Sequence, residues 1–412
     1  MRWVRRLAKG IWALLLVLAL LFQGGDTFGA GNPILQIARP HLFSTVAWEV
    51  RHLPQKWFHA FGELFRGSPG RDEEVRQVRR FFELTERTND AQERLDRAAG
   101  GANEGAAVSA LEAERDRLRR ERGRLQASVE RIMEGLITAV LREEGISSRA
   151  LFVRTLWPPV DFSLGRTPRV LIVSPRNRIE LAQAHLLDPD ITLAEAEALE
   201  RVVDGRNLSS LVEGTGGVAT YPSLVPDGSS LRGALETASH EWTHQYLFFH
   251  PLGRAYRAST NMTTVNETVA DMVGKEIGEK VYRRFFATPD ELSAGAGVRA
   301  PAEGGRPAFD FNGAMRETRL EAERLLAAGK VEEAEAYMEQ RRLFLADHGY
   351  FFRKINQAFF AFHGTYAGRP GAVSPIGGQL RSLRDRSPTL RAFLSRVAGY
   401  GSFDAFQRDV VG

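Results

Sequence analysis

Two histidines and a glutamate lie close together in the segment 236–246, which reads Glu-Thr-Ala-Ser-His-Glu-Trp-Thr-His-Gln-Tyr. His240 and His244 are four residues apart, so on an α-helix both imidazoles share one face, ~6 Å apart along the axis. Glu241 follows the first histidine, where its carboxylate can face a metal-bound water without binding the metal. Two neutral imidazoles, an open coordination position and a nearby base are what zinc-dependent hydrolysis requires. The segment therefore predicts a catalytic zinc site.

A third metal ligand is expected from a second helix, in the segment 261–282, whose apolar residues recur at helical spacing. Glu267 and Asp271 are four residues apart and share a face of that helix. The residues between the two helices, 245–261, include proline and glycine, which allow the chain to turn and the helices to pack antiparallel. We expect Glu267 to complete the zinc site and Asp271 to accept the outer N–H of a ligand imidazole.

The sequence His-Glu-x-x-His at 240–244, followed by Asn-Glu-x-x-x-Asp at 266–271, resembles the signature of the gluzincin metallopeptidases. This group comprises thermolysin-like enzymes and aminopeptidases, but the Gly-x-Met-x-Asn motif of the large aminopeptidases does not precede the zinc helix. The resemblance implies that the zinc ligands are His240, His244 and Glu267. It implies that Glu241 is the general base, which later returns its proton, and that Asp271 is the carboxylate partner of a ligand histidine.

Residues that contact the substrate are expected both before and after the two helices in the sequence. Gly216, Gly217 and Val218 begin a segment that favours a strand shortly before the zinc helix, and its glycines would let an extended substrate backbone pair there. An edge strand that simply ends in a turn is the alternative. Gluzincin catalysis also uses a tyrosine or histidine that donates to the oxyanion, and His363 and Tyr366 are the candidates, although aromatic residues in this stretch are also typical of a core.

The overall composition is that of a folded protein that also has room for a membrane element. The chain has 412 residues, of which 43% are apolar and 26% charged. A net charge of +4 gives no indication of nucleic-acid binding at this length. The absence of cysteine excludes a disulfide framework and thiolate chemistry.

Residues 1–24 are predicted to be a targeting or anchoring segment. Four cations precede an uncharged apolar run of residues 11–22, which matches a signal-peptide core and reaches the length of a short membrane span only with its flanks. The one cleavage candidate, Phe28-Gly29-Ala30, has a bulky residue where a small one is preferred, so an uncleaved anchor is favoured over a secreted precursor. In both cases the N-terminus stays cytoplasmic and the remainder of the chain crosses the membrane, with membrane lipid as a partner of an uncleaved anchor.

Two further regions precede the predicted catalytic domain. Residues 25–70 carry aromatic residues among basic ones and are expected either to lie on the bilayer surface as a juxtamembrane amphipathic region or to pack on the catalytic domain. Residues 71–147 are predicted to form a helical hairpin or short coiled coil, with a glycine-rich break near residue 100. Its heptad stripe comprises Leu111, Leu118, Leu125 and Ile132. The mixed charges of this hairpin indicate solvated faces, and it is a candidate stalk, homodimer element or partner arm.

Residues 148–412 are predicted to form the catalytic domain, an α+β, mostly helical, zincin-like fold with a small sheet. Short β-rich runs at 151–156 and 169–173 favour strands. A helix is expected over 191–203, where Thr192 and Glu195 can form a capping box. Further helices are expected later in the chain, at 313–328, 331–345 and 388–410.

Together these features predict a membrane-anchored zinc metallopeptidase that acts on a peptide or protein substrate. Two alternatives stay open: a zinc hydrolase or amidase acting on a non-peptide substrate such as cell-wall material, and a membrane-tethered coiled-coil scaffold with a structural zinc site. Glu241 separates the last alternative from the enzymes, because a structural site has four protein ligands and needs no free carboxylate beside them.

Overall fold

The structure is a computed structural model that describes residues 31–48, 70–99, 105–150, 153–293, 309–365 and 373–411. The predicted anchor at 1–24, most of the juxtamembrane region at 25–70, and Tyr366 lie outside these ranges. No helix within them is long and apolar enough to cross a membrane. The anchor and the expected membrane topology therefore stay predictions.

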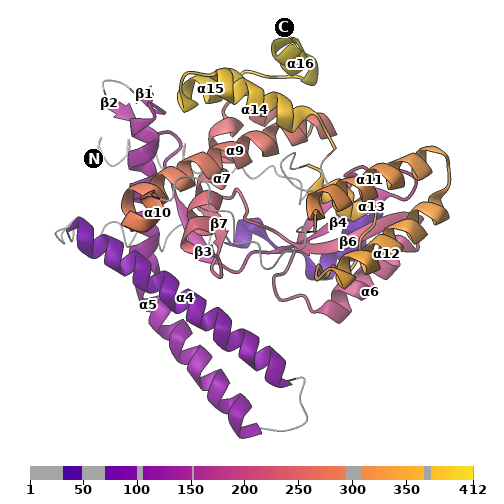
Figure 1. The fold of residues 1–412 in the computed structure, drawn as a ribbon, viewed down its shortest axis with the longest axis horizontal. Coiled ribbons are helices and arrows are strands. Elements are labelled where there is room, and N and C mark those ends of the chain that lie inside the picture. The colour runs from indigo at the N-terminus through magenta and orange to yellow at the C-terminus, as the bar shows by residue number, and fades with distance from the viewer. Residues whose placement is uncertain are drawn as a thin grey trace, which may run out of the picture.

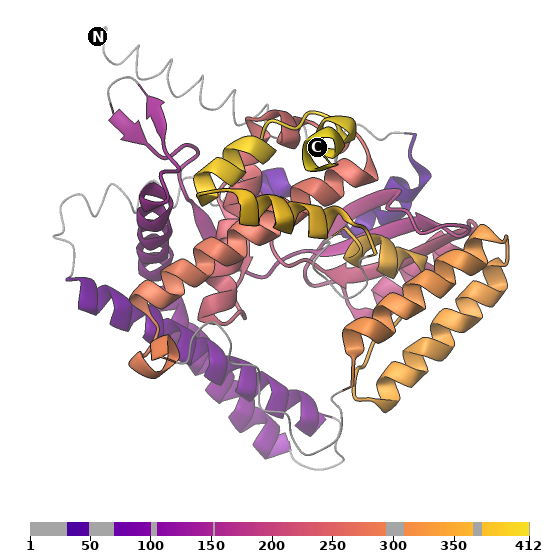
Figure 2. The same ribbon diagram turned by 45° about the horizontal axis from the view of Figure 1, so that its top comes forward.

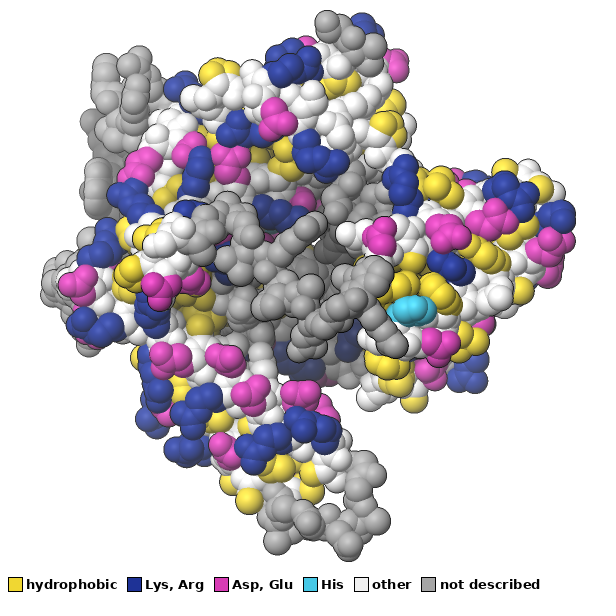
Figure 3. All heavy atoms as spheres, viewed as in Figure 1, with side chains coloured by type: hydrophobic (Ala, Val, Ile, Leu, Met, Phe, Trp, Pro, Cys, Tyr) yellow, Lys and Arg dark blue, Asp and Glu magenta, His cyan; other side chains and the backbone are white. Residues whose placement is uncertain are grey.

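The predicted helical hairpin consists of α4 (Arg71–Ala99) and α5 (Gly105–Glu143), which project from the body of the molecule (Figure 1). Its distal half is held together by a small cluster of Leu84, Ala91 and Leu118, with Leu125 packed against it. Cations and carboxylates alternate over its visible face (Figure 3), as the mixed charge of the sequence indicates. The heptad stripe thus faces the partner helix, and the charged positions face solvent.

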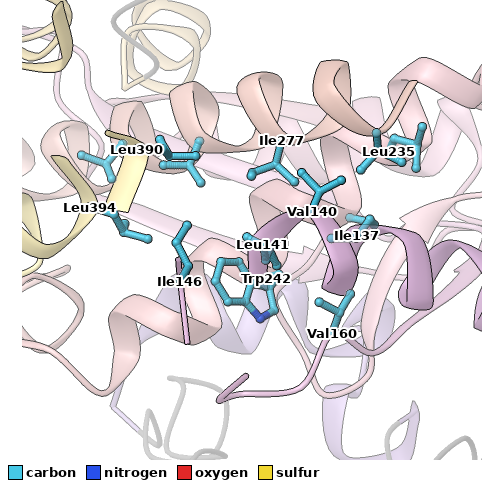
Figure 4. Packing of buried hydrophobic residues seen from close by; sticks show 14 of the residues in the cluster. Ile137, Val140, Leu141, Ile146, Val160, Leu235, Trp242, Ile277, Leu390 and Leu394 are labelled. Atoms are coloured by element: carbon cyan, nitrogen blue, oxygen red, sulfur yellow. The ribbon is translucent and has the colours of Figure 1, made fainter. Parts of the chain in front are cut away.

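The base of this hairpin belongs to the main core of the molecule. Leu136, Ile137 and Val140 of α5 are fully or almost fully buried in the same cluster as Trp242 of α7 (Leu231–Phe248) and Ile277 of α9 (Thr260–Phe285) (Figure 4). The C-terminal helices α14 (Ile376–Arg386) and α15 (Leu390–Val397) close this core, and α16 (Phe403–Val411) follows them. Residues on both sides of the boundary predicted near residue 148 therefore pack in one core, and the division into domains stays a prediction.

A three-stranded antiparallel sheet forms a second layer, in the order β5 (Gln183–Leu187), β4 (Arg169–Pro175) and β6 (Leu208–Gly214). Residues of β4 alternate between two apolar clusters, because successive side chains of a strand point to opposite faces. Val170 and Ile172 pack with α13 (Gln357–His363), and Leu171 and Val173 pack with α6 (Leu193–Asp204) and α2 (Pro33–Ala38). The sheet is therefore covered on both faces.

The helices predicted around this sheet are present. α6 begins with the capping box of Thr192 and Glu195. The predicted helices at 313–328 and 331–345 are α11 (Phe311–Ala327) and α12 (Val331–Asp347), which form a pair on the opposite side of the molecule from the α4–α5 hairpin (Figures 1 and 2). The mostly helical α+β class is confirmed.

The remaining described elements are short. β3 (Phe162–Gly165) pairs in parallel with β7 (Ser223–Pro226), and β1 (Ser148–Ala150) pairs antiparallel with β2 (Val153–Thr155). Single helical turns occur at η1 (Arg39–His41), α8 (Pro251–Arg254) and α10 (Pro289–Ser293).

Candidate metal centre

Two glycines bring the helices that carry the predicted site into backbone contact. A Cβ atom on Gly274 of α9 would lie 2.8 Å from Cβ of His240 and 2.9 Å from the carbonyl oxygen of Glu236 on α7. A Cβ on Gly278, one turn later, would lie 2.7 Å from the backbone nitrogen of Glu236. Since real Cβ atoms do not approach so closely, only glycine at these two positions permits this separation of the helices.

The three predicted ligands converge where the helices cross. The Nε2 atoms of His240 and His244 are 3.0 Å apart, and Oε2 of Glu267 lies 3.7 Å and 3.4 Å from them, respectively. Oε2 is buried and has no hydrogen-bond partner. A buried carboxylate oxygen without a donor is costly, and a cation held between it and the two imidazole nitrogens would satisfy it. The donor set therefore fits a metal ion.

Asn266 orients one of the two imidazoles. Nδ1 of His244 donates to Oδ1 of Asn266 at 2.8 Å, so Nε2 faces the other ligands and can bind a metal once it has lost its proton. Asn266 is 1% exposed, and its own amide donates to the carbonyl of Leu252. Asn266 belongs to the Asn-Glu-x-x-x-Asp motif, but the sequence predicted no role for it. The only signal for one was its position beside Glu267.

Tyr256, in the connection between α8 and α9, reaches the site as well. Its hydroxyl donates to Oε1 of Glu267, the carboxylate oxygen that does not face the histidines, and its ring lies edge-on to that of His244 at 6.0 Å between centroids. The sequence predicted only a turn in this connection. Nothing in the local pattern distinguishes Tyr256, because its role depends on where the connection returns to α9.

Burial and mutual attraction shift the pKa values of the ionisable ligands in opposite directions. Burial disfavours the charged form of His244, but the Glu267 carboxylate outweighs it and raises the pKa of His244 to about 9. Burial likewise disfavours the charged form of Glu267, and the two histidines outweigh it, so the pKa of Glu267 lies well below its usual range. Without a metal, the cluster is therefore held as a buried ion pair.

Glu241 lies beside the ligands in a different environment. Its side chain is 5% exposed, and burial raises its pKa while the two histidines act in the opposite direction. The backbone at Gly217 lies directly against it, since a Cβ there would overlap Oε1 of Glu241 and lie 2.8 Å from Cγ2 of Thr237. A carboxylate with a raised pKa is well suited to take up a proton near neutral pH.

The strand predicted to begin at Gly216, Gly217 and Val218 is reduced to one bridge. Only Val218 pairs, antiparallel, with Leu224 of β7, and both of its backbone hydrogen bonds to Leu224 measure 3.0 Å. The chain then turns back, with the N–H of Thr220 donating to the carbonyl of Val218, so no longer ladder can form. The prediction of a strand over this whole segment is wrong, whereas its role in substrate binding stays a prediction.

The other predicted site residues lie as follows. Asp271 pairs with Lys275 on α9 at 2.8 Å. Asn266 accepts from the outer nitrogen of His244. We expected Asp271 to take this role beside one of the two ligand imidazoles, and that role of Asp271 stays a prediction. His363 lies in α13 and packs on Phe359 and Phe362, in the aromatic cluster on the three-stranded sheet. Its proposed role as an oxyanion donor stays untested, as does that of Tyr366.

Comparison of the chain with family models, with curated proteins and with solved structures gives no match. The assignment of the site therefore depends on its own geometry.

Proposed function

We propose that this protein is a zinc-dependent metallopeptidase. The observation that carries the proposal is the convergence of His240, His244 and Glu267 on one point, with the buried carboxylate of Glu241 beside them.

The donor set favours a catalytic zinc ion over a structural one. Two imidazoles and a carboxylate suit zinc, and within the described ranges three such donors gather here, one fewer than a closed structural site uses. Zinc bound there would supply a Lewis acid that polarises a carbonyl group and lowers the pKa of a water molecule. This argues against the scaffold alternative.

The residues of the chain then take the following roles. Glu241 accepts a proton from the attacking water and delivers it to the leaving amine, for which its raised pKa suits it. Asn266 and Tyr256 position His244 and Glu267 through hydrogen bonds.

The backbone next to Glu241 is suited to an extended substrate. Gly217 presents no side chain there, and Val218 is already paired with Leu224 on one side only. A peptide that lies along Gly216 and Gly217 would bring its scissile bond to the general base.

Metal analysis and peptide hydrolysis by the purified full-length protein test the proposal together. We expect about one zinc per chain and cleavage of a mixed peptide library, with both lost in His244→Ala. Zinc on three ligands without cleavage of any peptide would contradict the peptidase and favour the non-peptide hydrolase. Full zinc retention by His244→Ala would contradict the site itself.

A further inference from the structure

A small cavity lies behind the metal-binding helix, with a volume of about 100 Å³. Tyr246 reaches it from α7, and because Tyr246 is two residues beyond His244 it points to the opposite side of that helix. Ser147 lines the cavity from the end of α5, and Arg391 and Ser395 line it from α15. We call this cavity the back pocket.

The polar side chains of the back pocket have unused hydrogen-bonding capacity. Within the described part of the chain, the side chains of Ser147, Tyr246, Arg391 and Ser395 make no hydrogen bond or ion pair. Arg391 and Ser395 are exposed, and Ser147 and Tyr246 are half-buried, so a ligand from solvent can reach all four donors. Because they line one hollow, they can donate together to a single acceptor from outside the chain.

The aliphatic stem of Arg391 packs on a turn. Gly145, two residues after the end of α5, has a φ of +74°, and a Cβ at this position would lie 3.3 Å from Cδ of Arg391. The side chain of Arg391 therefore lies across this turn. Burial raises the pKa of the Tyr246 hydroxyl, which keeps it protonated as a donor at neutral pH.

We propose that the back pocket binds a phosphate group. Its donors come from three separate segments of the chain, an arrangement that suits a tetrahedral anion with several free oxygens better than a planar carboxylate. A guanidinium with adjacent hydroxyls is a favoured phosphate-binding combination. A cavity of about 100 Å³ has room for one such group.

An exposed aromatic patch beside the back pocket indicates where the phosphate comes from. Trp157, which lines the pocket, is 46% exposed, and Phe248 and Phe249 at the end of α7 are 43% and 37% exposed. The ring centroid of Phe249 lies 5.9 Å from that of Trp157 and 5.4 Å from that of Phe248. Exposed aromatic rings next to an anion site fit the interfacial layer of a membrane, with a phospholipid phosphate in the pocket. A soluble phosphate is the other source.

Phosphate binding is tested first on the full-length protein in a maltoside detergent, which contains no phosphate. Titration of inorganic phosphate, followed by calorimetry, should give saturable binding that Arg391→Gln weakens by about tenfold or more, since one charge-assisted contact is removed. Arg381→Gln removes an exposed arginine of α14 that forms no ion pair with the described residues; it is the matched control and should bind as the wild type does. Ser395→Ala provides a second, smaller deletion within the pocket.

Phosphate could also bind a metal ion at the site of His240, His244 and Glu267. Its affinity there would not change in Arg391→Gln, so the difference in affinity between the two arginine variants reports on the back pocket alone. Equal binding by both variants, or no saturation by the wild type below about 10 mM phosphate, would overturn the proposal.

The source is tested by a fluorescent label on a single introduced cysteine, because the chain has none of its own. In phospholipid nanodiscs, the emission maximum of a label at Phe248→Cys should shift to shorter wavelength, because the label enters the membrane interface. The emission of a label at Leu343→Cys on α12 should not shift. With Arg391→Gln the shift at position 248 should diminish. Saturable phosphate binding without any shift at position 248 would assign the pocket to a soluble phosphate.

Discussion

At the scale of single residues, the site separates two carboxylates by their surroundings. Glu267 faces two histidines, and its pKa lies well below the usual range, whereas burial raises the pKa of Glu241. Carboxylates whose pKa values are shifted in opposite directions commonly divide the work, one as a ligand that stays ionised and one as a base that takes up protons. Glu267 is thus suited to bind the metal and Glu241 to act as the base.

Glu241→Gln should abolish most hydrolysis without loss of metal. The amide keeps the size of the side chain but cannot accept a proton, and general base catalysis contributes about 10²–10⁴-fold, so activity should fall at least that far. Metal content and thermal stability should stay near wild type, because Glu241 is not a ligand. Glu279→Gln on α9 is the control. Wild-type hydrolysis by Glu241→Gln would contradict the mechanism.

Asn266→Ala should weaken metal binding by about 10–100-fold, because it removes the group that orients His244. Zinc affinity measured by chelator competition checks this. Asp271→Asn is the informative comparison, since the sequence predicted that residue for the same role. A larger loss with Asp271→Asn than with Asn266→Ala would restore the sequence-based assignment.

Metal binding near neutral pH should release about one proton from His244. Its pKa in the metal-free fold is raised to about 9, so it is protonated below that pH and must lose the proton to become a ligand. Metal affinity should therefore increase as pH rises toward 9 and then level off. The ion pair between His244 and Glu267 stabilises the metal-free protein while His244 is protonated. This contribution to the free energy of unfolding is lost as the pH rises through about 9.

Calorimetric titration of metal in two buffers of different ionisation enthalpy measures the number of protons released. Heats that do not depend on the buffer at pH 7 would show that His244 is neutral before the metal binds.

At the scale of elements, the site depends on how closely α7 and α9 pack. The histidines and Glu267 can meet only because Gly274 and Gly278 let the two backbones touch. The turn before α7 is held by the hairpin, since Arg122 donates to the carbonyl of Asp227 at 3.0 Å and Asn89 donates to that of Gly228 at 3.0 Å.

Gly274→Ala should force α7 and α9 apart and reduce both stability and metal affinity. The added methyl group would overlap His240 and the backbone of Glu236, and overpacking of this kind costs about 1–3 kcal/mol. Gly135→Ala on α5 is the matched control, because its Cβ would meet nothing within 4 Å and alanine favours helices, so we expect it to stabilise slightly. Denaturant unfolding and zinc affinity check both variants. Similar effects of the two substitutions would contradict the close-packing argument.

At the scale of the whole molecule, the hairpin and the metal centre share one core. α5 also hydrogen-bonds the backbone of β3, with Glu130 accepting from the N–H of Leu164 at 2.7 Å and Glu134 accepting from that of Phe162 at 3.0 Å. The hairpin is therefore part of the support of the site. Its predicted role in forming a homodimer stays a prediction.

Ile137→Ala, at the base of the hairpin, should destabilise the metal centre together with the hairpin by about 2–5 kcal/mol. Leu118→Ala, in the separate distal cluster, should loosen only the far half of the hairpin. Hydrogen exchange measured along α5 and α7 distinguishes the two, since α7 should lose protection in the first variant and keep it in the second. Unchanged protection of α7 in Ile137→Ala would mean that hairpin and site are independent.

The sequence by itself determined the features that depend on near neighbours along the chain. The i, i+4 spacing placed His240 and His244 on one helical face, and Thr192 and Glu195 specified the start of α6. The heptad stripe predicted the hairpin, and the expected strand at 169–173 is part of β4. These patterns act within one or two turns of a helix or along one strand, where backbone geometry fixes which side chains share a face.

Only the tertiary structure decided which distant groups meet. It brought Asn266 and Tyr256 to the ligands and placed Gly217 against Glu241. It also reduced the strand predicted to begin at Gly216 to a single bridge at Val218. The base of the hairpin became part of the main core. Each of these contacts depends on the crossing of α7 and α9, or on where a connecting segment returns. Helical periodicity carries no information about either, because the separation of two helices is set by the shapes of the surfaces that pack.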